Sequence, residues 1–292
     1  MVIPSLNRSK HEILSLVGKG ATRVFRKADL ATLLRENRDR WGLAQNVRFA
    51  DFLEFLTTEG QLGEVSLPSE SDYSPIRRYV WGDITPFELA LGLKEGSYLT
   101  HSTAVFLHDL TEQIPQTIYV NAEQSPKPKP TGELTQESLD RAFRTHQRSS
   151  RYVFIHERNR FVILSGKNTG RYGVVSLPAP DGRKVQTTDL ERTLVDIVVR
   201  PAYGGGVHEV QAAFRAASDR LSISKLLATL RALDYVYPYH QALGFYLDRS
   251  GVPSKRLERL RKLGVEFNFY LAHGMKNPAL DSSWRVFHPK GL

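Results

Sequence analysis

The stretch GSYLTHSTAVFLHDLTEQ contains the residues that come closest to a set for phosphoryl transfer. A Gly-Ser turn followed by two carboxylates on one strand face, as in nucleotidyltransferases, binds nucleotide phosphates and magnesium. Gly96 and Ser97 precede Asp109 at a plausible distance, but the position two residues beyond Asp109 is Thr111. One aspartate cannot hold two metal ions, and residues 98–110 have the spacing of a helix. The sequence therefore predicts no catalytic site here.

The other candidates for acid–base or metal chemistry are scattered along the chain. His101 and His108 lie seven residues apart, whereas zinc-binding histidine pairs are typically one helical turn apart with an acidic partner nearby. A structural role is expected for each. No hydrolase or nuclease spacing connects the acidic residues Asp189, Glu191, Asp196, Glu209, Asp219 and Asp234. The chain contains no P-loop, Gly-x-Ser-x-Gly elbow or dinucleotide fingerprint, so we predict no cofactor, no metal and no enzymatic activity.

Positive charge distinguishes the chain more than any acid–base group does. Forty Lys and Arg residues against 31 Asp and Glu give a net charge of +9, and the pI is about 9.7. Such a balance favours a polyanion or an acidic protein as partner. Residues 1–90 carry 12 charges of each sign, whereas residues 91–292 carry 28 basic against 19 acidic residues. The whole excess therefore lies in the second part.

Length and composition predict a soluble, two-domain protein. A chain of 292 residues with 41% hydrophobic residues can bury a sizeable core. No apolar run approaches the roughly 18 residues of a membrane span, and the start MVIPSLNRSKHEIL lacks the apolar core of a signal peptide. Without cysteine there is no disulfide, thiolate zinc site or cysteine nucleophile. We expect a cytoplasmic protein.

The first 90 residues have the pattern of a winged helix-turn-helix domain. Apolar residues recur at helical spacing in 11–17, 27–37 and 47–60. Two strand-like runs, 62–67 and 77–82, follow, and the loop between them is rich in Pro, Ser and Asp. Three helices and a hairpin in this order are typical of the fold.

A winged helix usually places its third helix in the major groove of DNA and its wing along the backbone. The predicted third helix carries Asp51 and Glu54, which phosphates would repel. Contacts must therefore come from basic residues at the helix starts and the base of the wing: Arg23, Arg26, Lys27, Arg48, Arg77 and Arg78. The alternative is a module that contacts protein only.

Residues 91–292 are predicted to form a larger α/β domain with a small antiparallel sheet and several helices, so the fold class is mixed α+β. A helix follows Thr100, and a charged surface helix is expected in 133–146 after a Pro- and Lys-rich loop at 125–132. Strands are expected at 117–122, 151–156, 160–166, 171–178, 266–273 and 284–289. Helices are expected at 207–217, 223–233, 239–251 and 254–264.

The segment from Thr188 to Phe214 joins two apolar helical runs through a proline and three glycines. Thr188 or Asp189 is a good N-cap for a buried helix that Pro201 ends. The glycines at 204–206 permit a sharp reversal with positive φ. The Lys and Thr of a P-loop are missing, so a helix–helix joint is favoured over a phosphate site.

The run SKRLERLRKLG at 254–264 is an amphipathic helix with basic side chains on its outer faces. Charge runs of this kind are usually solvated faces. With the regional excess of positive charge, partner binding is an equal alternative. The residues concerned are Lys255, Arg256, Arg259 and Lys262.

Three segments that follow the winged helix, 98–120, 188–210 and 239–251, resemble the AbiEi-type antitoxins, a family of predicted transcriptional regulators of viral-defence systems. The resemblance covers most of the chain. Its most specific parts are a block of Ser102, Ala104, His108, Leu110 and Thr111, and a helix with Glu191, Arg192, Thr193, Leu194 and Asp196. Glu191 and Asp196 could equally serve to hold Arg192 within the fold.

The resemblance implies a two-part protein. Residues 1–90 would bind the promoter of the protein's own operon and repress it, as a dimer if the site is an inverted repeat. Residues 91–292 would neutralise a toxin that looks like a nucleotidyltransferase. Two other functions stay open. One is a metal-dependent enzyme acting on nucleic acid or nucleotides through Asp109, Asp189 and Asp196, and the other is a protein-interaction module that does not bind DNA.

Overall fold

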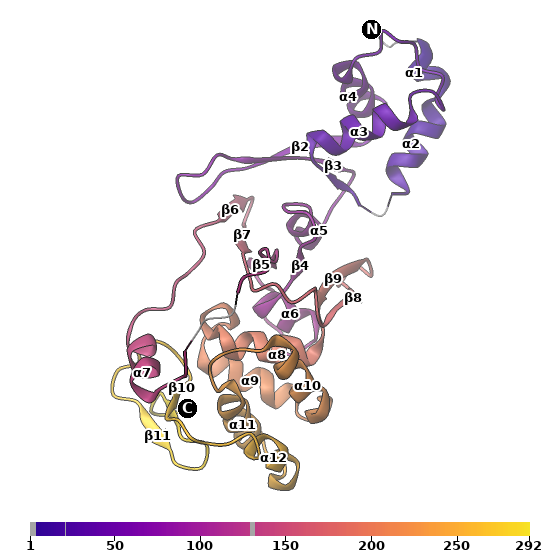
Figure 1. Cartoon of the computed structure of the whole chain (residues 1–292). Coiled ribbons are helices and arrows are strands. Elements are labelled where there is room, and N and C mark those ends of the chain that lie inside the picture. Colours follow the sequence, from indigo (N-terminus) through magenta and orange to yellow (C-terminus); the bar gives the residue numbers. More distant parts are fainter. Residues whose placement is uncertain (1–3, 21, 129–131) are drawn as a thin grey trace. The chain divides into compact units, whose positions relative to one another are not determined.

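The computed structural model describes residues 4–20, 22–128 and 132–292. The chain divides into two compact units (Figure 1). The first unit is Met1–Glu95 with Tyr152–Phe161, and the second is Gly96–Arg151 with Val162–Leu292. The sequence placed the boundary at residue 90. The inclusion of 152–161 in the first unit depends on long-range pairing, which no local pattern indicates.

The first unit is a winged helix preceded by a short extra helix. The element order and the antiparallel sheet order β1-β3-β2 are those of this fold, so the predicted three helices and wing are confirmed. Strand β1 was not predicted, because two residues carry no periodicity. The elements are α1 (Pro4–Arg8), α2 (Lys10–Gly18), β1 (Val24–Phe25), α3 (Lys27–Asn37), α4 (Phe49–Thr58), β2 (Leu62–Leu67), β3 (Ile76–Trp81) and α5 (Pro86–Leu91).

Helices α3 and α4 begin in the same way. The backbone N–H of Arg26 donates to Asp29, and that of Arg48 donates to Asp51, each at 2.7 Å. An acidic residue in the first turn also complements the helix dipole. Behind these starts, both helices bury apolar faces in one core, in which Phe52 is fully buried. The two N-termini therefore have fixed positions.

The connection between α3 and α4, residues 38–48, is irregular but anchored. Trp41 and Val47 are buried in the core of the unit, and Trp41 stacks on Phe52 with ring centroids 5.8 Å apart. The Arg38 guanidinium donates to the carbonyls of Ala44 at 2.9 Å and Val47 at 2.7 Å. This arginine is therefore a structural group and orients the chain as it enters α4.

The tip of the wing is held by the segment 152–161. The backbone N–H of Glu70 donates to the Val153 carbonyl at 2.9 Å. The Arg160 guanidinium makes two hydrogen bonds of 2.7 Å to the Glu70 carboxylate. Tyr73 stacks on Tyr152 with centroids 4.3 Å apart. A fragment that ends at residue 90 or 95 would therefore lack part of the winged-helix unit.

The sheet associated with the second unit has the strand order β6-β7-β5-β4-β9-β8, in which β6 and the start of β7 belong to the segment counted with the first unit. The predicted small antiparallel sheet is larger than expected and mixed: β4 pairs antiparallel with β5, and β8 with β9, but β4 and β9 pair in parallel. Both strands were missed, since each runs directly into a helix signal. The elements are β4 (Tyr98–Leu99), α6 (His101–Leu107), β5 (Thr117–Asn121), α7 (Gln136–Arg144), β6 (Val153–His156), β7 (Asn159–Leu164), β8 (Val174–Pro178) and β9 (Lys184–Thr188).

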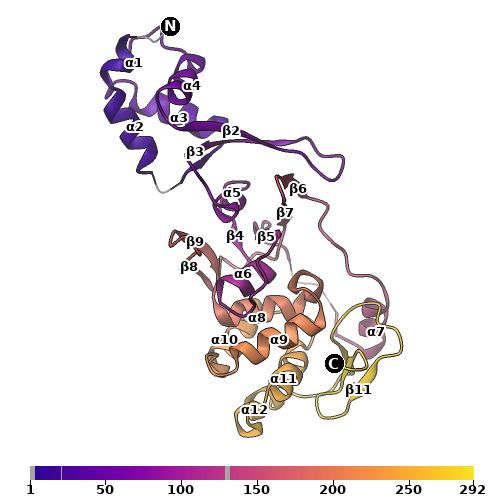
Figure 2. The same cartoon turned by 180° about the vertical axis from the view of Figure 1, so that it is seen from behind.

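Helices α8 to α12 lie together in both views (Figure 1, Figure 2) and contribute most of a large apolar core. Close approach is visible at Gly244, where an added Cβ would lie 2.2 Å from the ring of the buried Trp284. These elements are α8 (Leu190–Val199), α9 (Val207–Ala217), α10 (Ile223–Leu233), α11 (Tyr239–Arg249) and α12 (Ser254–Arg261). A small sheet of order β10-β12-β11 follows, made of Phe269–Tyr270, Val286–His288 and Ala279–Asp281 respectively.

The glycine-rich segment is a joint between α8 and α9, as predicted. Gly205 and Gly206 have φ values of 89° and 99°, which side-chain-bearing residues rarely adopt. A short 3-10 helix, Pro201–Gly204, precedes them. An added Cβ at Gly204 would lie 2.9 Å from Ile197. Glycine is therefore needed here for backbone conformation and for packing.

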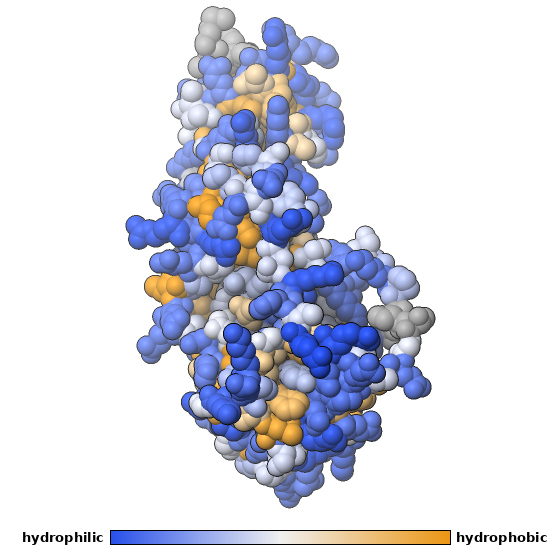
Figure 3. Space-filling model, turned by 90° about the vertical axis from the view of Figure 1, so that its left-hand side faces the viewer, coloured by the Kyte–Doolittle hydropathy of each residue, from blue (hydrophilic) through white to orange (hydrophobic). Residues whose placement is uncertain are grey.

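Two surface predictions have different outcomes. Helix α7 forms as predicted, but Leu139 and Phe143 are buried, so it packs on the core by one face. Of the predicted loop at 125–132, residues 129–131 lie outside the described residues, and 125–128 contain no helix or strand. No described helix is both long and apolar enough to cross a membrane. The face in Figure 3 is mostly hydrophilic, with apolar residues in separate patches.

Candidate nucleic-acid interface and a buried polar network

The N-termini of α3 and α4 each carry an exposed cation. Lys27, the first residue of α3, lies with its Nζ 5.8 Å from the centroid of the Phe49 ring on α4. Arg48 immediately precedes α4, and both basic side chains are exposed. Helix N-termini carry partial positive charge and favour phosphate oxygens. Two positive charges therefore stand exposed at the starts of two neighbouring helices.

Two of the six predicted DNA contacts are engaged inside the unit. Arg26 pairs with Asp29 at 2.7 Å and with Glu95 at 3.0 Å, and its hydrogen bond to Asp29 raises its pKa. Arg78 donates to the carbonyls of Gly92, at 2.7 Å, and Leu93, and burial lowers its pKa. Both guanidinium groups therefore have structural partners.

The other four predicted contacts have no ion pair in the part of the chain that the structure describes. They are Arg23, Lys27, Arg48 and Arg77. Arg77 is exposed on β3, opposite Ser66 of β2, and so lies on the wing. Arg23 is half-buried, and its carbonyl accepts from the Trp81 N–H at 2.8 Å. Helix starts and wing thus both present cations.

The outward face of α4 carries negative charge and no basic side chain. Ala50, Glu54 and Thr57 are exposed, at a spacing that places them on one side of the helix. Phe52 and Phe55 are buried on the opposite side. Asp51, whose carboxylate accepts the Arg48 N–H, keeps its negative charge and lies one turn before Glu54.

Helix α12 exposes the basic surface predicted for it. Lys255, Arg256, Arg259 and Lys262 are all exposed, whereas Leu257 and Leu260 are buried. Arg259 donates to the Ser224 hydroxyl at 2.7 Å, next to the start of α10. This surface belongs to the second unit, where the excess positive charge of the chain is concentrated.

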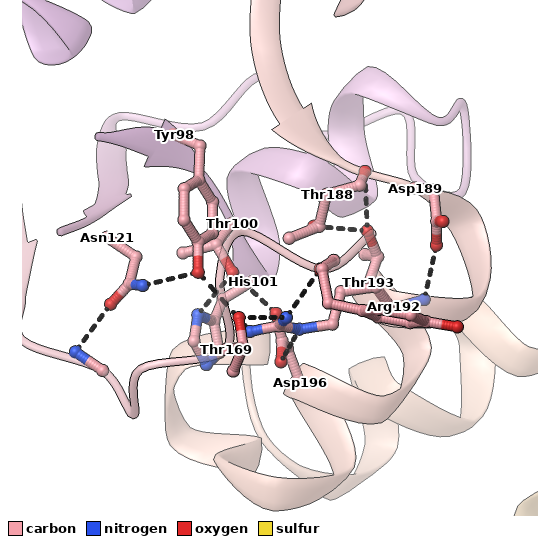
Figure 4. A network of polar contacts seen from close by, with 12 residues as sticks. Tyr98, Thr100, His101, Asn121, Thr169, Thr188, Asp189, Arg192, Thr193 and Asp196 are labelled. Carbon is pink, nitrogen blue, oxygen red and sulfur yellow. Dashed lines mark hydrogen bonds and ion pairs between the residues drawn. The ribbon is translucent and has the colours of Figure 1, made fainter. Parts of the chain in front are cut away.

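A buried ion pair lies at the centre of the second unit's polar network (Figure 4). Arg192 Nε donates to Asp196 Oδ1 at 2.7 Å, and each side chain is 5% exposed. The other carboxylate oxygen accepts from the Thr100 hydroxyl at 3.0 Å, and Arg192 also donates to the Tyr172 carbonyl at 2.9 Å. Burial raises the pKa of Asp196, against the effect of Arg192. The network connects α8 to the sheet.

His101 completes this network as a neutral group. Its Nδ1 lies 3.1 Å from the Thr100 hydroxyl, which uses its only hydrogen on Asp196, so Nδ1 must carry a hydrogen and donate. Burial, with Arg192 and Arg200 nearby, lowers the pKa of His101 to about 3. Its φ of 53° places it in the left-handed region, directly after Thr100.

Glu191 does not hold Arg192, contrary to one expectation from the sequence. Its carboxylate accepts from the Ser222 N–H at 2.9 Å and pairs with Lys225 at 3.0 Å. Burial opposes ionisation, but these two donors lower the pKa of Glu191 overall. Lys225 also pairs with Asp189 at 3.2 Å. Glu191 therefore fixes α10 against α8.

The remaining motif residues also make internal contacts. The Thr193 hydroxyl lies 2.7 Å from that of Thr188, and His108 Nε2 lies 2.7 Å from the Thr188 carbonyl. Ser102 is half-buried and lines a cavity of about 260 Å³ with Tyr203 and the glycine joint. The motif thus positions α6, β9 and α8 relative to one another.

The three aspartates of the enzymatic alternative are not brought together as a metal site. Asp189 caps α8 by accepting the Arg192 N–H at 2.8 Å, and Asp196 pairs with Arg192. Asp109 has a φ of 55° and follows the C-terminal end of α6. Across residues 4–20, 22–128 and 132–292, no group of three or more His, Cys, Asp or Glu could hold a metal ion.

Sequence reasoning missed several members of the network. The Glu123 carboxylate accepts from the Thr169 N–H and the Tyr98 hydroxyl, each at 3.0 Å. Asn121 donates to the same hydroxyl at 2.8 Å, and burial raises the pKa of Tyr98 to about 12. The only available signal was a polar pair, Asn121 and Glu123, at the end of an apolar strand.

Comparisons with known proteins give a structural likeness. No family model matches the chain, and no curated protein does. Among solved structures, the chain is similar to the RV2827C protein from Mycobacterium tuberculosis, with 16% identity and a TM-score of 0.55 over 98% of this chain and 92% of that one. This likeness supports the mixed α+β fold, with a helical N-terminal region and a larger α/β part, and carries no function.

The network predicts a large stability cost for Asp196→Asn. Removing the carboxylate leaves the Arg192 charge buried and unpaired, which costs about 3–5 kcal/mol. Asp181→Asn is the matched control, since Asp181 pairs with Arg183 at the surface and such pairs contribute about 0–1 kcal/mol. Urea unfolding of both variants measures the difference. Equal, small effects would show that the ion pair is dispensable.

His101 predicts a pH dependence of stability. Unfolded histidine has a pKa of about 6.5, whereas folded His101 titrates near 3. The contribution of His101 to the free energy of unfolding is therefore complete above about pH 6.5. Below that pH it falls by about 1.4 kcal/mol per pH unit. His101→Asn, which tolerates positive φ, should flatten this slope between pH 6.5 and 4.5. Urea unfolding checks this, with the exposed His208→Asn as control, and an unchanged slope in His101→Asn would refute it.

Proposed function

We propose that this protein is the antitoxin of an AbiEi-type toxin–antitoxin pair and represses its own operon by binding promoter DNA. The observation that carries the DNA-binding part is the pair of cations at the N-termini of α3 and α4, Lys27 and Arg48, in a winged helix. These are positions at which the fold contacts the phosphate backbone. Arg77 on the wing adds a third cation on a second element.

The antitoxin part rests on the resemblance of the motif segments and is supported by charge. The α12 surface suits an acidic patch on a partner protein, and opposite charges steer such an encounter. The proposed partner is a nucleotidyltransferase-like toxin. Two of the three aspartates of the enzymatic alternative, Asp189 and Asp196, are engaged in helix capping and ion pairing, so we propose a regulator without catalytic activity. It would act in the cytoplasm, as a dimer on an inverted repeat.

The test is fluorescence anisotropy of the full chain with labelled duplex from upstream of its own gene and with a scrambled duplex. The double variant Lys27→Ala/Arg48→Ala should weaken binding to both and reduce the slope of log affinity against log salt by about 2, because each phosphate contact contributes roughly 0.9.

Lys255→Ala/Arg256→Ala on α12 is the matched control, since it removes the same charge from another surface. It should leave DNA affinity near that of the unchanged protein. An equal loss of DNA affinity in this control would show that binding depends on overall positive charge and not on the winged helix. If the unchanged protein binds no duplex at low salt, the repressor proposal is wrong.

A further inference from the structure

We propose that Glu54 is a base-reading residue that accepts a hydrogen bond from the N4 amino group of a cytosine in the major groove of the operator. This inference rests on the proposed DNA-binding function and deepens it. It assigns a recognition role to the residue that, by charge alone, argues against DNA binding.

The position of Glu54 on α4 is fixed by packing. Phe52, Phe55 and Leu56 are buried on the inner side of the helix, at 0–3% exposure, so the helix cannot rotate without exposing them. Glu54 is consequently held on the outer side with Ala50 and Thr57. In a winged helix this is the side that enters the major groove.

The carboxylate of Glu54 is the one acidic group of α4 without a structural task. Asp51 accepts the Arg48 N–H at 2.7 Å, and Glu59, just beyond the helix, pairs with Lys10. Glu54 contributes only its backbone carbonyl, which accepts from the Thr58 hydroxyl at 2.8 Å. Within the described residues, no cation lies within ion-pair distance of its carboxylate.

The chemistry of the groove selects cytosine. A carboxylate offers acceptors only, so guanine, with N7 and O6, and thymine, with O4, would repel it. Adenine presents an amino donor beside the acceptor N7. Cytosine presents its N4 donor without such an acceptor on the same base. Ala50 and Thr57 add methyl groups that suit contact with a neighbouring thymine.

The repulsion between Glu54 and the phosphates is offset locally. Lys27 and Arg48 lie at the N-terminal ends of α3 and α4, and Arg77 lies on the wing. These cations can hold the two sides of the groove while Glu54 faces base edges. Phosphate contacts fix position, and base contacts carry specificity.

The test measures base preference at every position of the bound site, by competitive binding of a randomised duplex library and sequencing of the bound fraction. For the unchanged protein we expect one position where replacing cytosine weakens binding roughly 5- to 150-fold. Glu54→Ala should abolish that preference and leave the others intact. Glu54→Gln should shift it toward adenine, because glutamine pairs with N6 and N7.

Glu36→Ala is the control, since it removes an exposed carboxylate at the other end of α3. It should leave the profile unchanged. If Glu54→Ala keeps the cytosine preference, or strengthens binding to all sequences equally, Glu54 does not read a base and DNA binding itself still stands. If the unchanged protein binds no duplex at low salt, the proposed function fails, and this outer face must serve protein contact instead.

Discussion

The arrangement of the second unit depends on the buried ion pair between Arg192 and Asp196. Two charges at 5% exposure are tolerable only when each is paired and hydrogen-bonded, since their desolvation costs several kcal/mol per ion. The partners come from distant segments: Thr100 follows β4, and Tyr172 precedes β8. Burial of α8 therefore requires the sheet and its loops to close around one site. Most of the residues that carry the family resemblance make these internal contacts. Their residue types are therefore explained by folding, and a catalytic role is not needed to explain them.

In the first unit, the proposed DNA binding depends on charges that make no internal ion pair. Asp29 and Asp51 start their helices, and Arg26 and Arg78 are engaged by acidic groups and carbonyls. Lys27, Arg48 and Arg77 remain exposed at two helix starts and on the wing, and Glu54 remains exposed on α4. The first 90 residues therefore have no net charge, although their charges are distributed unevenly over the surface. Composition alone would have argued against nucleic-acid binding by this unit.

The sequence predicted the elements that depend on local interactions and missed those that depend on residues far apart in the chain. Periodicity and capping predicted α3 to the residue and α4 and α8 to within two residues at each end, because these signals are local. Strands β4 and β9 were missed, since they pair with each other across about 90 residues. In the candidate interface, the sequence indicated which basic residues could contact DNA. It could not indicate that Arg78 donates to the carbonyls of Gly92 and Leu93. Glu123 gave no spacing that indicates a role, because its partner Thr169 lies 46 residues away.

The central claim is that the winged-helix unit, and not the more basic second unit, reads DNA. Hydrogen exchange of the full chain, with and without duplex from upstream of its own gene, tests it most directly. The account predicts slower amide exchange at the starts of α3 and α4 and along β2 and β3, with α12 unchanged. Slower exchange confined to α12, or no change at saturating DNA, would contradict it.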